Sequence, residues 1–558
     1  MTGQPLFLTL HMLVVEKIIK YLEGRPRGSF DEDIDYQNEM KKVLYPLLSI
    51  GEIWYEAVLV SICDSCKIVF DDAHGVFKIY FPAWPEGFSY TGFHNYNLVK
   101  RVVMVAPSWE DVCDKDASET IAWSRYNGAI FPSATTLVVK LIKSSSLSRH
   151  TTAKLDPKAN HNEIVSLARS IRRLTPAVTR LSVVAISADT RGKPCRALCV
   201  MLVSALCRES VTRLDVSCQV DSPILLLRLY DVSRLTTITH GAHIPCSPIA
   251  WLAYLNASTL RELHIVPTVR DDWDSLICYG NKTHASYTSL VSLSMDITET
   301  FSAQSWTTVE GSIPFPSLAK LTVFGVYPID DDTLFRGNHG TLRNLSLPVD
   351  AIAKNALGGF NVLNYSATPM NSIHITPTTS GHRPITSDSL VQEQVHRILR
   401  SSMTLQLYCG IPTCDVFKAL CTAPRTAIIQ HLILFNQSCA IDNIISIVSA
   451  LPSLVSLTTE IHGSATRIGL IPENEHPSVL HEKYYPLSIK FRVLRILGAE
   501  YTNIGKVSIL AMQIAVICPT FAYVDIPPEE RREFRGKVAW SSKNGPFKPY
   551  GAALRRLI

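Results

Sequence analysis

Two cysteines near the start of the chain have a spacing that could support metal chemistry. Cys63-Asp-Ser-Cys66 has the spacing of a zinc-ligand pair, because two thiolates three positions apart can reach one tetrahedral ion. A structural zinc site needs two further ligands, and no second close pair of Cys or His lies nearby in the sequence. We therefore interpret these two cysteines as buried thiols and expect no metal site.

The catalytic motifs found in the chain are incomplete. Gly87-Phe-Ser-Tyr-Thr-Gly92 is one residue longer than a Gly-x-Ser-x-Gly nucleophile elbow, and His481-Glu482 lacks the second histidine of a metalloprotease helix. The acidic runs at 31–35 and 330–332 lack the glycine and closing glutamate of a calcium loop. We therefore expect a protein that is not an enzyme and needs no cofactor. A hydrolase with an unrecognised constellation of Ser or Cys, His and Asp is the catalytic alternative.

Composition indicates a folded protein of a reducing compartment. Of 558 residues, 46% are hydrophobic and only 18% are charged, which is enough apolar material for a large core. The net charge of +5 is mild for this length and gives no reason to expect nucleic acid as a partner. The 14 cysteines lack paired spacing, and no apolar run reaches the roughly 18 residues that cross a bilayer. We expect a cytoplasmic or nuclear location and no membrane partner.

The chain repeats one short frame, apolar-x-x-apolar-x-apolar. Between the central apolar residues of consecutive frames the interval is 24 to 30 residues, which is typical of stacked units that share one core. The clearest frames are Val211–Val216, Leu260–Ile265, Leu290–Met295, Leu318–Val323 and Leu342–Leu347, and later frames are Ile429–Leu434, Leu454–Thr459, Phe491–Ile496 and Phe521–Ile526.

Each frame predicts a short strand, and the apolar segments between frames predict helices or helical turns. An alternating stretch from Lys67 to Phe81, broken by an Asp-Asp-Ala-His-Gly turn, predicts a hairpin or an initial strand before the array. The segment Met370–Gln394 is rich in Thr, Ser and Pro, and we interpret it as an inserted loop. The expected organisation is a helical module at 1–65, a connecting segment and cap at 66–130, a repeat array at 131–528 with a loop insertion near 370–394, and a basic tail at 529–558.

The frame resembles a leucine-rich repeat, in which each unit adds one strand to a curved parallel sheet. Openers such as Phe315-Pro-Ser-Leu-Ala-Lys-Leu321 strengthen this resemblance. The ninth position, where the family usually has a turn-bonding asparagine, holds other residues in this chain, for example Thr268 and Thr298. The resemblance implies an α/β fold, an irregular solenoid with outer helices.

Two apolar segments near the N-terminus have a second recognisable pattern. The first predicted helix ends in Ile18-Ile-Lys-Tyr-Leu22, and the second contains Leu47-Leu-Ser-Ile50-Gly-Glu-Ile-Trp54, which reads Leu-x-x-apolar-x-x-x-Trp. Together they resemble an F-box, as in divergent F-box and leucine-rich-repeat proteins of fungi, although the Leu-Pro that usually opens the motif is missing. The resemblance implies a substrate receptor of a Skp1-cullin-F-box ubiquitin ligase. The expected contacts with a Skp1-like adaptor are Leu10, Leu13, Ile18, Leu22, Leu47, Ile50 and Trp54.

Alternation along each strand predicts which side chains are free to bind a partner. The first, fourth and sixth positions of the frame point to the core, and the third, fifth and seventh face solvent on the concave side. The expected contacts with a protein target are Arg180, Arg213, Asp215, Glu262, His264, Lys320, Phe324, Phe435, Arg495 and Tyr523. We expect a non-enzymatic recognition protein. A repeat scaffold or adaptor without a ubiquitin role is the alternative.

Overall fold

The structure is a computed structural model. It describes residues 58, 64–71, 76–80, 96–106, 131–142, 171–186, 206, 210–217, 234–240, 247–266, 276, 278–279, 283–284, 286–297, 314–325, 341–348, 369–376, 388–407, 418–434, 441–461, 491, 493–498, 522–524, 535–536 and 539. The predicted F-box-like module lies outside these residues except at Val58, Asp64 and Ser65, and all seven expected adaptor contacts lie outside them.

The chain divides into two compact units, Met1–Leu260 and Arg261–Ile558. In the first unit, parallel pairs join neighbouring strands in chain order from β3 to β7, and β1 pairs with β3. These strands are β1 (Ser65–Asp71), β3 (Arg101–Ala106), β4 (Thr136–Ile142), β5 (Arg180–Ile186), β6 (Arg213–Ser217) and β7 (Thr237–His240).

A hairpin covers the β1 edge of the first unit. β2 (Val76–Tyr80) pairs antiparallel with β1, and Phe70 stands opposite Phe77 in this register. The hairpin predicted for Lys67 to Phe81 is therefore confirmed. β1 and β3 also pair in parallel, so parallel pairing in this unit already includes strands that precede the expected start of the array at residue 131.

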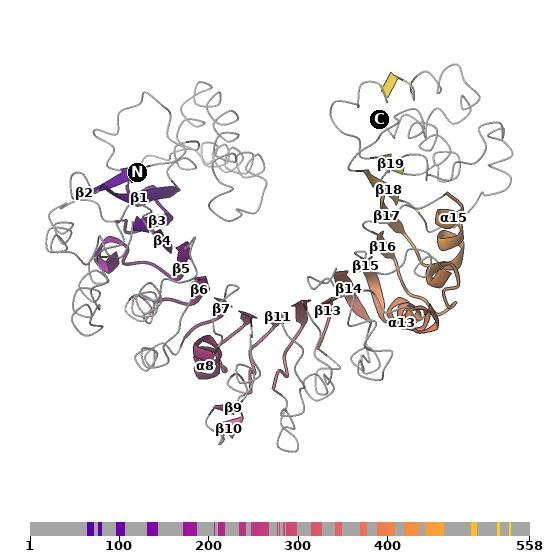
Figure 1. Cartoon of the computed structure of the whole chain (residues 1–558), viewed down its shortest axis with the longest axis horizontal. Helices are drawn as coiled ribbons and strands as arrows, with labels where there is room; N and C mark the ends of the chain where they lie inside the picture. The colour runs from indigo at the N-terminus through magenta and orange to yellow at the C-terminus, as the bar shows by residue number, and fades with distance from the viewer. Residues whose placement is uncertain are drawn as a thin grey trace, which may run out of the picture. The chain divides into compact units, whose positions relative to one another are not determined.

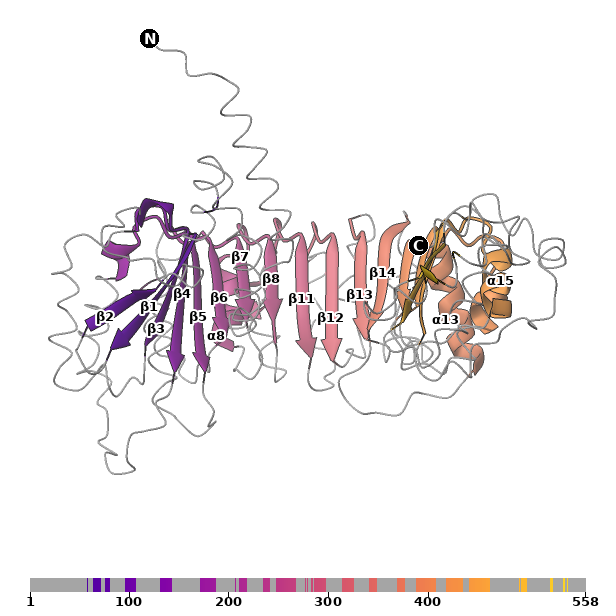
Figure 2. The ribbon, with the colours of Figure 1, turned by 90° about the horizontal axis from the view of Figure 1, so that it is seen from above.

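In the second unit, parallel pairs join β8 to β11 and then each strand to the next as far as β19. Figure 2 shows the middle strands of this unit side by side, running in one direction. The strands are β8 (Glu262–Ile265), β11 (Ser292–Ile297), β12 (Lys320–Gly325), β13 (Asn344–Pro348), β14 (Met370–Thr376), β15 (Ser402–Leu407), β16 (His431–Leu434), β17 (Ser456–Ile461), β18 (Val493–Gly498) and β19 (Ala522–Val524). A separate two-stranded sheet pairs β9 (Cys278–Tyr279) with β10 (Thr283–His284).

Helical segments complete several repeats. Figure 1 shows α13 (Asp388–Ser401) and α15 (Ile441–Ala450) on the same side of the second unit's sheet. α8 (Ser247–Leu255) occupies the apolar segment predicted as helix before the frame Leu260–Ile265. A short 3-10 helix, η2 (Tyr96–Leu98), precedes β3. Each unit is thus a solenoid-like α/β stack, as the frame predicted.

Two rows of aliphatic side chains form the core of each unit. In the first unit, Leu137, Leu181 and Leu214 share one register row and are at most 2% exposed. In the second unit the equivalent row contains Leu263, Leu293, Leu321, Leu345, Ile373, Leu405, Leu432 and Leu457, all at most 2% exposed. Burying one such side chain contributes about 1.5–3 kcal/mol, so the fourth and sixth positions of the frame carry much of the folding energy.

A recurring turn before the strands helps to fix the register of the stack. One carbonyl of a repeat accepts two successive N–H groups of the next repeat, as Thr135 does from Thr179 (2.9 Å) and Arg180 (2.9 Å). The same pair of hydrogen bonds to one carbonyl recurs at Lys100, Thr179, Thr212, Arg261, Val291, Ala319, Arg343 and Gln430. Threonines of the first unit add a side-chain bond, since the hydroxyls of Thr179, Thr212 and Thr236 each donate to the preceding repeat's carbonyl.

The described parts of the segment expected to be an inserted loop near 370–394 are regular structure. Residues Met370–Thr376 form β14, and α13 begins at Asp388. Met370, Ile373 and Ile375 follow the repeat frame and are buried, so the polar residues between them face outward and do not signal a loop. The surrounding Thr, Ser and Pro residues concealed this frame.

Candidate binding surface

The outward face of each sheet, defined as the face opposite the leucine rows, carries the side chains available to a partner. Strand alternation places the third and fifth positions of every frame there. In the second unit the third-position row contains Glu262, Ser292, Lys320, Asn344, Ser372, Thr404, His431 and Ser456, and the fifth-position row contains His264, Ser294, Thr322, Ser346, His374, Gln406, Ile433 and Thr458. Both rows are almost entirely polar, in contrast to the rows beneath them.

Hydrogen bonds between neighbouring strands hold this face in a defined arrangement. The Ser372 hydroxyl donates to Asn344 Oδ1 at 2.9 Å, and His431 Nδ1 lies 2.7 Å from Ser456 Oγ. Side chains that are already ordered lose less conformational entropy when a partner binds. The face is therefore better prepared for binding than a set of freely rotating side chains.

Lys320 influences the protonation of His374 on the outward face of the second unit. Burial lowers the pKa of His374 below its ordinary value, and the positive charge of Lys320 lowers it further. Lys320 is exposed on β12, two strands away from His374 in the register. The His374 imidazole therefore stays neutral to lower pH and presents a hydrogen-bonding group without a charge.

Phe324 is the largest exposed apolar side chain among the residues that the structure describes. It is 38% exposed at the seventh position of its frame, and the register places it opposite Asp296 of β11. Exposed aromatic side chains act as anchors in protein interfaces, because they bury much area at little cost in conformational entropy. Phe324, Asp296 and Lys320 together offer one apolar, one acidic and one basic contact on neighbouring strands.

The expected target contacts divide between the two units. Arg180, Arg213, Glu262 and Lys320 are exposed, and Asp215 and His264 are half-buried. Arg495 and Tyr523 are register partners on β18 and β19, while Phe435 lies outside the described residues. The side chains of this face that were missed include His374, Asn344 and Gln406. The frame Met370-x-x-Ile373-x-Ile375 was the signal that could have found His374.

The rule that the fifth and seventh positions face solvent fails at several strands. Ser182 and Thr322 at the fifth position are 7% and 9% exposed, and Lys140 at the seventh is 6% exposed. Val266, also at the seventh position, is 2% exposed. Strand alternation fixes which face a side chain occupies, but it does not determine whether other parts of the chain cover that face.

The structure describes part of the cysteine pair Cys63/Cys66 but not the incomplete catalytic motifs. Cys66 belongs to the core row, because it pairs with Val102 in the register and is fully buried. In the described part of the chain, no group of three or more His, Cys, Asp or Glu is placed to hold a metal ion. Gly87–Gly92 and His481-Glu482 lie outside the described residues.

No family model and no curated protein matches this chain.

The outward face is the feature of this chain that bears on its function. The outward face combines registered polar rows, an exposed aromatic side chain and charges of both signs. Within the described residues, no helix is both long and apolar enough to cross a membrane. The arrangement is suited to contacts spread over several strands, which is how a protein partner is bound.

Proposed function

We propose that this chain is a protein-recognition subunit that binds its target on the outward faces of its repeat units. The observation that supports this most is the contrast between the two faces in the second unit. Leucine rows are fully buried on one face, while Glu262, Lys320, His431 and Phe324 remain exposed on the other. Specific interfaces combine such charged and polar groups with a few aromatic anchors.

A photo-crosslinking amino acid at position 324 tests this proposal. The same photo-crosslinking amino acid at position 400 is the matched control, because Arg400 is exposed on α13. We expect one defined protein to be captured from position 324 and not from position 400, and Lys320→Glu to reduce that capture. Capture of the same proteins from both positions, or of none from position 324, would contradict the proposal.

We further propose that the N-terminal segment docks a Skp1-like adaptor, so that the bound target is presented to a ubiquitin ligase. This proposal depends on the resemblance of Ile18–Leu22 and Leu47–Trp54 to an F-box. Co-purification of Skp1 with the intact chain, repeated with Trp54→Ala and Ile18→Asp, is the test. We expect Skp1 with the intact chain and its loss from both variants. Absence of Skp1 from the intact chain would favour a scaffold without a ubiquitin role.

A further inference from the structure

Two arginines stand side by side on the outward face of the first unit. The register pairs Arg180 of β5 with Arg213 of β6, and neighbouring strands lie about 4.8 Å apart. Both side chains are exposed, and no ion pair joins either of them to a residue that the structure describes. Among the residues that the structure describes, neither guanidinium group has a hydrogen-bond partner.

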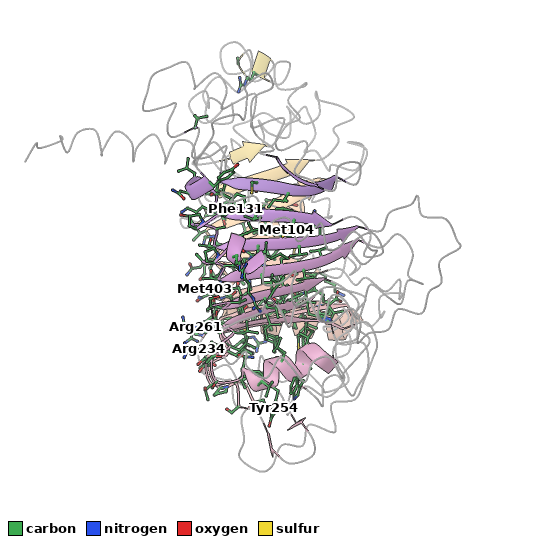
Figure 3. All side chains as sticks on the ribbon, turned by 90° about the vertical axis from the view of Figure 1, so that its left-hand side faces the viewer. Met104, Phe131, Arg234, Tyr254, Arg261 and Met403 are labelled. Carbon is green, nitrogen blue, oxygen red and sulfur yellow. The ribbon has the colours of Figure 1, made fainter. Side chains whose placement is uncertain are left out.

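The charges around this pair are also mainly positive. Thr136 and Thr237 flank the pair in the same register row, and Arg101 precedes Thr136. Lys100 and Arg234 are exposed at the edge where the strands begin, and Figure 3 shows Arg234 at that edge. We name Lys100, Arg101, Arg180, Arg213 and Arg234 the arginine strip.

Two acidic side chains are described near the arginine strip. Asp215 is half-buried and accepts a 3.1 Å hydrogen bond from the Ser182 hydroxyl. Asp64 is half-buried at the far end, where its carbonyl accepts the N–H groups of Lys100 and Arg101. Neither carboxylate lies in the register row of Arg180 and Arg213.

Folding alone does not account for the pairing of Arg180 with Arg213. Like charges directly opposite each other on neighbouring strands are destabilising. The adjacent residues Thr179 and Thr212 carry no charge that could compensate the repulsion, and their hydroxyls donate to backbone carbonyls. An anionic group bound between the two guanidinium forks would turn this repulsion into attraction, because each fork can bind a carboxylate through two hydrogen bonds.

We propose that the arginine strip docks an acidic peptide segment of the protein target, which extends the proposed recognition function and depends on it. From Arg101 to Arg213 the row crosses three strand spacings, about 14 Å. This is the length of about four residues of extended peptide. The row contains threonine and no aromatic side chain, so among the described residues it lacks the stacking platform that single-stranded nucleic acid uses.

Fluorescence anisotropy with a labelled ten-residue polyglutamate probe tests this proposal on the full chain. Polyglutamine of the same length and a ten-nucleotide oligouridylate are the comparison probes. The test variant is Arg180→Gln with Arg213→Gln. Arg400→Gln with Arg425→Gln is the matched control, because it removes the same charge from two exposed arginines of the second unit. Thermal unfolding of all three proteins confirms that each one is folded.

We expect polyglutamate to bind and polyglutamine not to bind. Polyglutamate binding should weaken as added salt shortens the Debye length below about 10 Å. The Arg180 and Arg213 variant should bind about tenfold more weakly, and the control should bind as the unmodified chain does. Equal weakening in both variants would show non-specific attraction and overturn the proposal. So would absent binding, or tighter binding of oligouridylate. Each of these results leaves the crosslinking test at position 324 unaffected, so failure here is distinguishable from failure of the proposed function.

Discussion

The side-chain amide of Asn256 joins two consecutive repeats of the first unit. Its Oδ1 accepts the backbone N–H of Leu235 at 2.9 Å, and its Nδ2 donates to the carbonyl of Leu252 at 2.9 Å. Asn256 is fully buried, so water cannot replace either bond. The bonding asparagine that the sequence lacked at the ninth position of the frame is thus supplied, at this one repeat, from the end of a helix.

Asn256→Ala should destabilise the chain by about 1–3 kcal/mol, because it leaves the buried N–H of Leu235 without an acceptor. Chemical denaturation followed by circular dichroism measures the loss. Asn371→Ala is the control, since Asn371 is exposed. That substitution should change stability by less than about 0.5 kcal/mol. Equal effects of the two substitutions would refute the bridging role of Asn256.

The pKa of His374 should rise when Lys320 is replaced by Met. Lys320→Met removes the repulsion between the lysine and the protonated imidazole, while the larger cause, burial, remains. The pKa should therefore move only part of the way back to its ordinary value of about 6.5. Nuclear magnetic resonance of labelled histidine, assigned with His374→Gln, follows this change. An unchanged or lower pKa would contradict the electrostatic interpretation, and Lys418→Met serves as the control.

His374 should also make stability depend on pH. Because its pKa is lowered in the folded state, the unfolded chain binds a proton first as the pH falls below about 6.5. The free energy of unfolding therefore decreases from that pH down to the lowered pKa and then levels off, while it is unaffected above the ordinary value. His374→Gln should flatten this part of the curve, which denaturation at several pH values measures. An unchanged slope in the variant would show that other groups cause the dependence.

Truncation of two adjacent residues of β12 should change stability by very different amounts. Leu321 is fully buried in the leucine row, so Leu321→Ala should cost about 2–5 kcal/mol. Lys320 is exposed, and Lys320→Ala should change stability by less than about 0.5 kcal/mol. Denaturation curves of both variants test the assignment of faces. A large loss for Lys320→Ala would mean that the outward face is not open.

The thiol of Cys421 should react slowly with iodoacetamide in the folded chain. Burial raises its pKa above the ordinary value, and a hydrogen bond with Ser446 lowers it by a smaller amount. Ser446→Ala should therefore raise the pKa further and slow alkylation, because less thiolate is present at a given pH. Peptide mass spectrometry at several pH values gives the rate at this residue. The denatured chain provides the unperturbed rate, and faster alkylation in the variant would contradict the assignment.

Sequence periodicity was sufficient to predict the core of the repeats but not all of their boundaries. Leu214, Leu263 and Leu321 lie in the predicted rows because a period of two along a strand leaves few alternatives for burial. β14 was missed because its frame is short and lies among Thr, Ser and Pro residues, which also occur in loops. Local composition and repeat periodicity gave opposite signals there, and periodicity was correct.

The candidate surface was harder to predict, because exposure depends on what packs over a face. Arg180, Arg213 and Lys320 are exposed as expected. Ser182 lies two residues after Arg180 on the same strand and on the same face, but it is buried. Nothing in its own frame signals this burial. The positive charge of the arginine strip also becomes visible only after register brings together residues that lie 33 positions apart.

The double hydrogen bond in the turn before each strand has a consequence for how this chain tolerates changes in length. Because one oxygen holds two successive amides of the next repeat, a residue inserted between that turn and its strand would shift both bonds. Repeats whose central apolar residues lie 24 and 30 residues apart keep the same pairing of those residues, so the difference in length falls between the end of one strand and the turn before the next. Peptide tags or new loops therefore belong beyond the strand ends, and the opposite edge should be left unaltered.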